Sequence, residues 1–216
     1  MNSFYARLAA AWLVSVGVGC TSAPIRYYTL AAPPDKSLLA AETTLAIDAR
    51  VIHTPPQLNR SELMVRTGPT EVTLLENERW ASPVNDEIKD ALRLELRRRF
   101  SRMTGLHAAY AKLTLDIDVQ RLEAELGRYA LFEAFWSATL SATGHRSTGV
   151  RATTCSFQSY EKIRVGYAGM VEGYQREIAA LADAIVATLT SPASGIDASC
   201  QESIEGSTGG SAPKDR

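Results

Sequence analysis

The chain has 216 residues, of which 45% are hydrophobic and 22% charged, and its formal net charge is -1. This composition is ordinary for a globular protein, and the lack of a basic excess argues against a dedicated nucleic-acid binder. Outside the N-terminus no apolar run reaches the roughly 18 residues that suggest a membrane-spanning helix, which excludes a polytopic membrane protein. The three cysteines are too few for a disulfide scaffold and are not spaced as zinc ligands.

The N-terminal segment has the composition of an export signal. Residues 1–7 carry the α-amino group and one arginine, and residues 8–18 are almost wholly apolar. The small residue Gly19 then precedes Cys20. A charged region, an apolar region and a small residue in this order predict a secretory signal peptide over residues 1–19. Its apolar run is too short to cross a bilayer as a helix.

The end of this signal resembles a bacterial lipobox. The residues that carry the resemblance are Gly17-Val18-Gly19-Cys20. The resemblance implies that Cys20 receives a diacylglycerol and an N-acyl chain and becomes the mature N-terminus, with no other cofactor. Thr21 stands where the inner-membrane retention signal has aspartate, which implies an anchor in the inner leaflet of the outer membrane, facing the periplasm. The alternative is an ordinary secreted protein with a chance cysteine.

Lipidation of Cys20 would leave two thiols, Cys155 and Cys200. In an oxidising compartment two such thiols are a candidate disulfide. The alternative is two separate free thiols. A bridge between Cys155 and Cys200 would attach the first part of the C-terminal tail to a predicted strand.

The first half of the mature chain is rich in strand signals, which begin after a short tether over residues 20–24. The segments with β-forming or alternating residues are 25–30, 44–52, 62–67 and 71–76. The last two flank Gly68-Pro69, a turn signal, and predict a hairpin.

Two segments, residues 84–100 and 166–190, carry apolar residues at helical spacing. Acidic residues at the start of the first helix and arginines at its end complement the helix macrodipole. The arginine cluster over residues 97–102 has two readings: contact with anionic lipid headgroups, or helix capping and solvation. Residues 77–83, before this helix, are predicted as a connector.

Alternating segments between the helices predict an antiparallel meander. They cover residues 110–123, 130–140 and 153–162. Residues 191–216 are rich in serine, glycine and alanine and predict a flexible tail. Residues 25–190 are therefore expected to form a single α+β domain, a mostly antiparallel sheet covered by two amphipathic helices.

No group of residues has the spacing of a catalytic or metal site. His53, His107 and His145 are scattered, and neither a nucleophile elbow nor a phosphate-binding loop occurs. Asp116 and Asp118 share one strand face, which is more often a solvated face than a cation site. We therefore expect no catalytic residue, no metal and no enzymatic activity.

Several motifs follow one another in a characteristic order. They are YYTL at residues 27–30, PQLNRSELMVR at residues 56–66, ERWASP at residues 78–83 and the helix that begins near Tyr167. Together they resemble the ABC-type transport auxiliary lipoproteins, the family that includes the membrane-integrity lipoprotein PqiC, over roughly residues 20–190. The Arg-Trp-Ala-x-Pro element between hairpin and helix is the most specific part.

The resemblance implies a non-enzymatic subunit of an intermembrane phospholipid transport system that maintains envelope integrity. The partners it implies are a mammalian-cell-entry (MCE) domain protein and its ABC transporter, and we also consider self-association into a ring. Among the matching residues, Arg60, Arg79, Trp80 and Tyr167 are the candidates for partner binding. Trp80 also fits a core plug between helix and sheet, which is the reading we favour.

The alternative function is a periplasmic shuttle that carries a lipid in a pocket between the helices and the sheet. The apolar stripes of the helices match the width needed to cover the sheet, which argues mildly against such a pocket.

Overall fold

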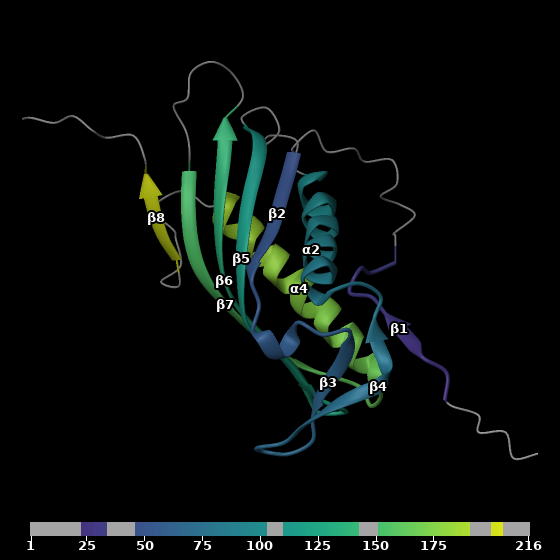
Figure 1. Ribbon diagram of the computed structural model, residues 1–216. Coiled ribbons are helices and arrows are strands. Elements are labelled where there is room, and N and C mark those ends of the chain that lie inside the picture. The colour runs from purple at the N-terminus through teal and green to yellow at the C-terminus, as the bar shows by residue number, and fades with distance from the viewer. Residues whose placement is uncertain (1–22, 34–45, 103–109, 143–150, 191–199, 205–216) are drawn as a thin grey trace, which may run out of the picture.

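The structure, a computed structural model, describes residues 23–33, 46–102, 110–142, 151–190 and 200–204. Figure 1 shows that strands dominate these residues and that two α-helices accompany them, which confirms the predicted α+β class. The predicted signal peptide, Cys20, His107, His145 and most of the predicted tail lie outside the described residues.

The larger of two sheets has five strands in the order β2-β5-β6-β7-β8. These strands are β2 (Ala46–His53), β5 (Tyr110–Glu125), β6 (Tyr129–Ala142), β7 (Arg151–Lys162) and β8 (Cys200–Ile204). The antiparallel meander of β5, β6 and β7 is confirmed. Two features were not predicted: β2 pairs with β5 in parallel, and β8 forms a strand within the predicted tail by pairing with the edge of β7.

Alternation makes one face of this sheet apolar. On β6 the side chains buried on this face are Ala130, Phe132, Ala134, Trp136, Ala138 and Leu140. On β5 the alternation shifts at Gln120, because a β-bulge lies between Val119 and Arg121. Leu122 and Ala124 therefore face the core, although a strict two-residue period from Val119 would turn them outward.

The smaller sheet has the order β1-β4-β3. It consists of β1 (Arg26–Tyr28), β3 (Glu62–Arg66) and β4 (Val72–Trp80), and a short 3-10 helix, η2 (Pro56–Leu58), precedes β3. The predicted hairpin of β3 and β4 is confirmed. The prediction of a connector over residues 77–83 is wrong for residues 77–80, which belong to β4. The strand extends this far because β1 pairs in parallel with this end of β4.

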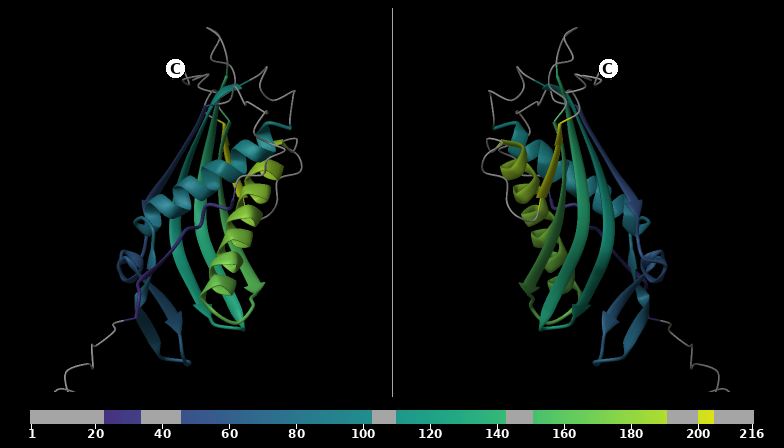
Figure 2. Two further views of the ribbon diagram at one scale, coloured as in Figure 1. Left: turned by 90° about the vertical axis from the view of Figure 1, so that its right-hand side faces the viewer. Right: turned by 90° about the vertical axis from the view of Figure 1, so that its left-hand side faces the viewer.

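Both helices, α2 (Val84–Phe100) and α4 (Tyr167–Thr190), lie on the same face of the larger sheet, as the two views of Figure 2 show. The other face carries no helix among the described residues. None of the described helices is both long and apolar enough to cross a membrane.

The arginine cluster at the end of α2 holds the two helices together. Arg99 donates to Asp183 of α4 at 2.6 Å and to the Ala179 carbonyl at 2.8 Å. The carboxylate of Asp183, foremost among the acids near it, raises the pKa of Arg99. Arg98 bonds Glu95 at 2.8 Å, so this part of the cluster is engaged within the domain.

Candidate functional site

A cleft with a volume of about 410 Å³ opens where β1, β4 and the start of α2 meet. Its walls include Tyr27, Arg60, Arg79, Trp80 and Pro83. We call it the arginine cleft. It brings together three of the four candidates for partner binding, Arg60, Arg79 and Trp80, with Tyr27 of the YYTL motif.

Strand register explains how the cleft forms. Parallel pairing sets Tyr27 beside Arg79 on the outer face of the small sheet, while Glu78 and Trp80, the neighbours of Arg79, are buried. Arg60 reaches the same place from the loop that follows η2. The exposed fraction of Tyr27 is 65%.

The charge of the cleft is positive. Glu62 is the acid paired with Arg79, at 3.4 Å. The pKa of Glu62 is lowered, first by hydrogen bonds from its own backbone N–H and from Ser61 and then by the two arginines, so it stays ionised at neutral pH. Within the described part of the chain Arg60 forms no side-chain ion pair. The two positive charges of Arg60 and Arg79 therefore exceed the one negative charge of Glu62 beside them.

Trp80 forms the floor of the cleft, and most of its side chain is buried beneath it. Its exposed fraction is 7%, and its ring centroid lies 6.3 Å from that of Tyr174 on α4. These contacts are those of a plug between the small sheet and α4.

Tyr167 lies on the opposite face of β1. The guanidinium carbon of Arg26 is 5.9 Å from its ring centroid, a cation–π contact. Arg26 also donates to the buried carboxylate of Glu78, with its Nε at 2.9 Å, and Tyr28 donates to the same group at 2.7 Å. The hydrogen bond to Glu78 is the main cause of the raised pKa of Arg26. Tyr167 thus joins α4 to β1.

Glu87 holds the walls of the arginine cleft in place. Its carboxylate accepts hydrogen bonds from the backbone N–H and hydroxyl of Ser82, at 3.0 and 2.7 Å. It also accepts bonds from the Thr29 hydroxyl and the Leu30 N–H, both at 2.8 Å. One buried side chain therefore joins the end of β1, the loop after β4 and α2. Sequence reasoning missed it, because Ser82 and Glu87 are five residues apart and do not have the three-residue spacing of a capping box.

The helix-free face of the larger sheet carries exposed aromatic side chains. Tyr129 and Tyr160 stack with ring centroids 5.0 Å apart, and the exposed fractions of Tyr160 and Phe135 are 65% and 49%. Large aromatic groups of this kind are typical anchors of protein interfaces.

A second cleft, of about 350 Å³, lies between the β3–β4 hairpin and β5. Met64 and Val72 line it, and Arg66 crosses its wall to Glu123 at 2.8 Å. Burial alone would raise the pKa of Glu123, but hydrogen bonds from Arg66 and Tyr129 lower it. The ion pair therefore joins the hairpin to β5 at the wall of this cleft.

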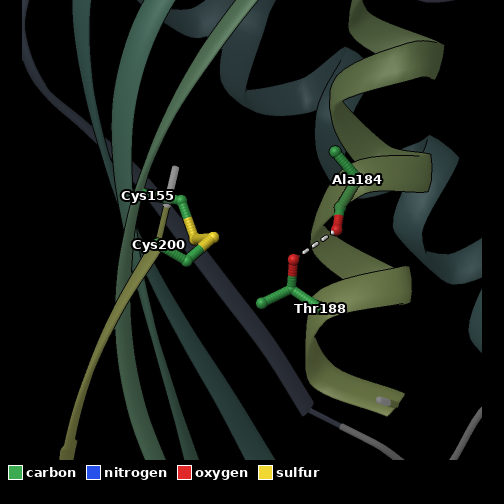
Figure 3. Close-up of a disulfide and its surroundings, with 4 residues drawn as sticks. All are labelled: Cys155, Ala184, Thr188 and Cys200. Atoms are coloured by element: carbon green, nitrogen blue, oxygen red, sulfur yellow. Dashed lines mark hydrogen bonds between the residues drawn. A yellow bond between two sulfur atoms is a disulfide. The ribbon is translucent and has the colours of Figure 1, made fainter. Parts of the chain in front are cut away.

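Cys155 and Cys200 are directly opposite each other on β7 and β8, with Cα atoms 4.0 Å apart, and their sulfurs are joined. Figure 3 shows the pair on the side of the sheet that faces α4, near Thr188, whose hydroxyl donates to the Ala184 carbonyl at 2.9 Å. The placement is compatible with the predicted disulfide, which stays a prediction for the protein in its compartment.

The described residues offer little that resembles catalytic chemistry. No group of three or more histidine, cysteine, aspartate or glutamate side chains among them could hold a metal ion. Asp116 accepts a hydrogen bond from Arg50 across β2 and β5 at 2.9 Å, and Asp118 accepts one from Gln120 at 2.8 Å. Both carboxylates thus have protein partners on the solvated face.

Glu177 differs from the other buried acids, Glu78 and Glu87, whose carboxylates accept hydrogen bonds. It is fully buried on α4, and both of its carboxylate oxygens lack a hydrogen-bond partner within the described structure. Burial, reinforced by the nearby charge of Glu161, raises the pKa of Glu177 to about 9. The Arg176 charge and the backbone N–H groups of Glu161 and Phe132 oppose this shift without reaching hydrogen-bond geometry.

Solved structures resemble this fold. A crystal structure of an uncharacterized protein matches with a TM-score of 0.56 and 18% identity, covering 78% of this chain and all of that one. Protein XCC0632 from Xanthomonas campestris, of the family DUF330, matches with a TM-score of 0.47 and 16% identity over 75% of this chain and 92% of that one. The first likeness supports the fold alone. A comparison with curated proteins finds no match.

The sequence itself assigns the family. Residues 28–186 match the ABC-type transport auxiliary lipoprotein component, a stretch that runs from the last residue of β1 into α4 and includes α2 and the strands from β2 to β7. This match agrees with the resemblance carried by the Arg-Trp-Ala-x-Pro element and the flanking motifs. The chain therefore belongs to the family of ABC-type transport auxiliary lipoprotein components.

Proposed function

We propose that this protein is a lipid-anchored, non-enzymatic subunit that docks an MCE-type intermembrane phospholipid transport system at the outer membrane and thereby maintains envelope integrity. The observation that carries the proposal is the family match over residues 28–186, which names an auxiliary component of ABC-type transport. The domain would work beside an ABC transporter and its MCE-domain protein. Of the four candidates for partner binding, Arg60, Arg79 and Tyr167 keep exposed surface, whereas Trp80 is buried and is suited to packing.

The anchor would concentrate the domain at the site of docking. Acylation of Cys20 confines the domain to the periplasmic face of the membrane, which raises its effective concentration for a partner that ends there. The exposed aromatic side chains Phe135 and Tyr160 on the helix-free face are suited to contact that partner. A ring of several copies would let one conduit end meet several such faces.

The alternative, a shuttle with a lipid between helices and sheet, receives less support. The cavity beside Trp80 and Tyr174, between the small sheet and α4, measures about 20 Å³. Ligand pockets commonly measure about 300–1,000 Å³. Trp136, Phe132 and Phe100 are themselves fully buried in the core that an acyl chain would have to enter.

The anchor is tested by comparing the full-length chain with its Cys20→Ala variant in cells fed labelled palmitate. The expected result is label on the native protein, which fractionates with outer membranes on a density gradient, and neither property in the variant. A variant that keeps its membrane fraction would contradict the anchor. Mass spectrometry of the natively extracted protein tests the shuttle, which requires one bound phospholipid per chain.

A further inference from the structure

We propose that the arginine cleft binds the anionic phospholipid headgroups of the membrane in which the protein is anchored. The proposal rests on the anchor at Cys20, and it gives the domain a second, non-covalent membrane contact. It also assigns the occupant of a cleft whose chemistry the family description does not name.

The length of chain between anchor and cleft limits where the cleft can lie. Three peptide units separate Cys20 from Ala23, the first described residue, and can span at most about 11 Å. Tyr27, in the wall of the cleft, is seven residues after Cys20 and therefore within about 25 Å of it even if the chain is fully extended. The cleft thus stays within reach of the lipid headgroups.

The face of β1 that carries the cleft has an interfacial composition. Ile25 and Tyr27 alternate to the same side of the extended chain, with exposed fractions of 46% and 65%. Tyrosine prefers the headgroup level of a membrane, where its ring is partly apolar and its hydroxyl stays hydrated. The small sheet therefore presents an apolar and aromatic rim beside the two arginines.

The charge of the cleft complements an anionic headgroup. Arg60 has no ion-pair partner among the described residues, and Arg79 is held only by Glu62 at 3.4 Å and by the Glu76 carbonyl at 3.3 Å. A planar guanidinium group can donate two parallel hydrogen bonds to a phosphate. Two such groups at one cleft can therefore bind the phosphodiester of a phosphatidylglycerol.

The other arginine cluster is less suited to this role. Arg98 and Arg99 bind Glu95, and Arg99 also binds Asp183, so these two are occupied. Arg97 stays exposed but is 13 residues into α2, about 20 Å along the helix from Val84 at the cleft end. The structure therefore favours the arginine cleft over the end of α2 as the lipid contact.

The test measures partitioning of the mature chain, residues 20–216 with Cys20→Ser, onto vesicles by co-sedimentation. One set of vesicles contains equal parts phosphatidylcholine and phosphatidylglycerol, and the other contains phosphatidylcholine alone. We expect binding that prefers the anionic vesicles. It should fall about thirtyfold in the double variant Arg60→Ala with Arg79→Ala, the scale of two basic residues at an anionic surface. The matched control, Arg97→Ala with Arg102→Ala, removes the same charge from the end of α2 and should reduce binding less than twofold. Circular dichroism confirms that each variant is folded.

Three results would overturn the proposal. One is equal binding to both kinds of vesicle, and another is an equal loss of binding in the control pair. The third is binding of inorganic phosphate that is lost in the Arg60→Ala and Arg79→Ala double variant, together with no binding to vesicles. This result would assign the cleft to a soluble anion. Failure of the anchor itself is seen separately, as absence of palmitate label on Cys20.

Discussion

At the scale of single residues, Trp80 shows how one side chain serves both packing and site. It forms the floor of the arginine cleft and packs against Tyr174 across the junction of the small sheet with α4. We expect Trp80→Ala to lower the free energy of unfolding by about 3–5 kcal/mol, because a large buried ring is removed. Urea denaturation measures the change, and Tyr27→Ala, which removes an exposed ring from the same cleft, is the control. A stable Trp80→Ala variant that loses only partner binding would instead make Trp80 an interface residue.

The raised pKa of the buried Glu177 side chain leads us to expect an unusual dependence of stability on pH. Its pKa in the folded protein is about 9, whereas an ordinary glutamate has 4.5, so between these values the folded state keeps a proton that the unfolded state has released. The free energy of unfolding should therefore fall as pH rises from about 4.5 to about 9. At pH 7 the free energy of unfolding should be about 3 kcal/mol lower than at pH values below 4.5, as a result of this one group.

The variant Glu177→Gln removes this titration without a large change of shape. We expect it to be more stable than the native protein at pH 8 and to show a smaller loss of stability between pH 5 and 8, as measured by urea denaturation across that range. Glu172→Gln, on the same helix and ion-paired near the surface, is the control. Parallel pH profiles for the native and Glu177→Gln proteins would show that Glu177 is ionised in the fold.

At the scale of elements, the approach of α4 to the sheet depends on a glycine. A Cβ atom built on Gly173 would lie 2.4 Å from a methyl group of Ile163 and 3.2 Å from Cβ of Ala130. Glycine to alanine within a helix ordinarily stabilises by about 1 kcal/mol. Here we expect Gly173→Ala to destabilise by about 1–3 kcal/mol, because the helix must move away from the sheet.

Thermal unfolding measures this effect, with Gly68→Ala as the control, since a Cβ there meets its nearest neighbour at an ordinary 3.7 Å. The control should change stability by less than about 0.5 kcal/mol. A stabilised Gly173→Ala variant would show that α4 does not pack as closely as the structure places it.

The pairing of β8 with β7 is the element that depends most on covalent chemistry. If Cys155 and Cys200 form a disulfide, the exported protein should have no free thiol at these positions and should change mobility on reduction. Replacing both cysteines by alanine should lower the free energy of unfolding by about 2–4 kcal/mol, since the bridge closes a loop with a sequence separation of 45. Thiol titration under denaturing conditions decides the point, and two reactive thiols per lipidated chain would rule the bridge out.

The elements that were predicted correctly are those with strong local periodicity. The helix over residues 84–100 and the meander of β5, β6 and β7 follow directly from the spacing of apolar side chains. Parallel pairing of β1 with β4 and of β2 with β5 joins segments far apart in the chain, and no local pattern encodes it. The extension of β4 to Trp80 was missed for the same reason.

At the scale of the whole molecule, the arginine cleft was only partly predictable. Arg60, Arg79 and Trp80 belong to motifs that mark the family, and the structure brings them together. The role of Glu87 could not be predicted from the sequence, because acidic residues near the start of a helix are usually solvated. Its burial depends on the segment after β1, where the Leu30 N–H donates to the Glu87 carboxylate. Tyr167 was grouped with the cleft residues but lies on the other side of β1.

The placement of surfaces on the molecule fits a docking subunit. The cleft beside β1 lies next to the end of the chain that leads to Cys20. The exposed side chains of Phe135 and Tyr160 belong to β6 and β7 and alternate to the face opposite the helices. Figure 2 shows that both helices lie on one face of this sheet. A domain held to the membrane at the first surface would keep the second surface free for a partner.

The most direct test of this account is crosslinking of the full-length lipoprotein in its own membranes, followed by capture and mass spectrometry of proteins and lipids together. We predict an MCE-domain protein in near-stoichiometric yield, with crosslinks that map to the helix-free face around Phe135 and Tyr160. Capture of phospholipid at one molecule per chain, with no transport protein, would contradict the docking role and favour the shuttle.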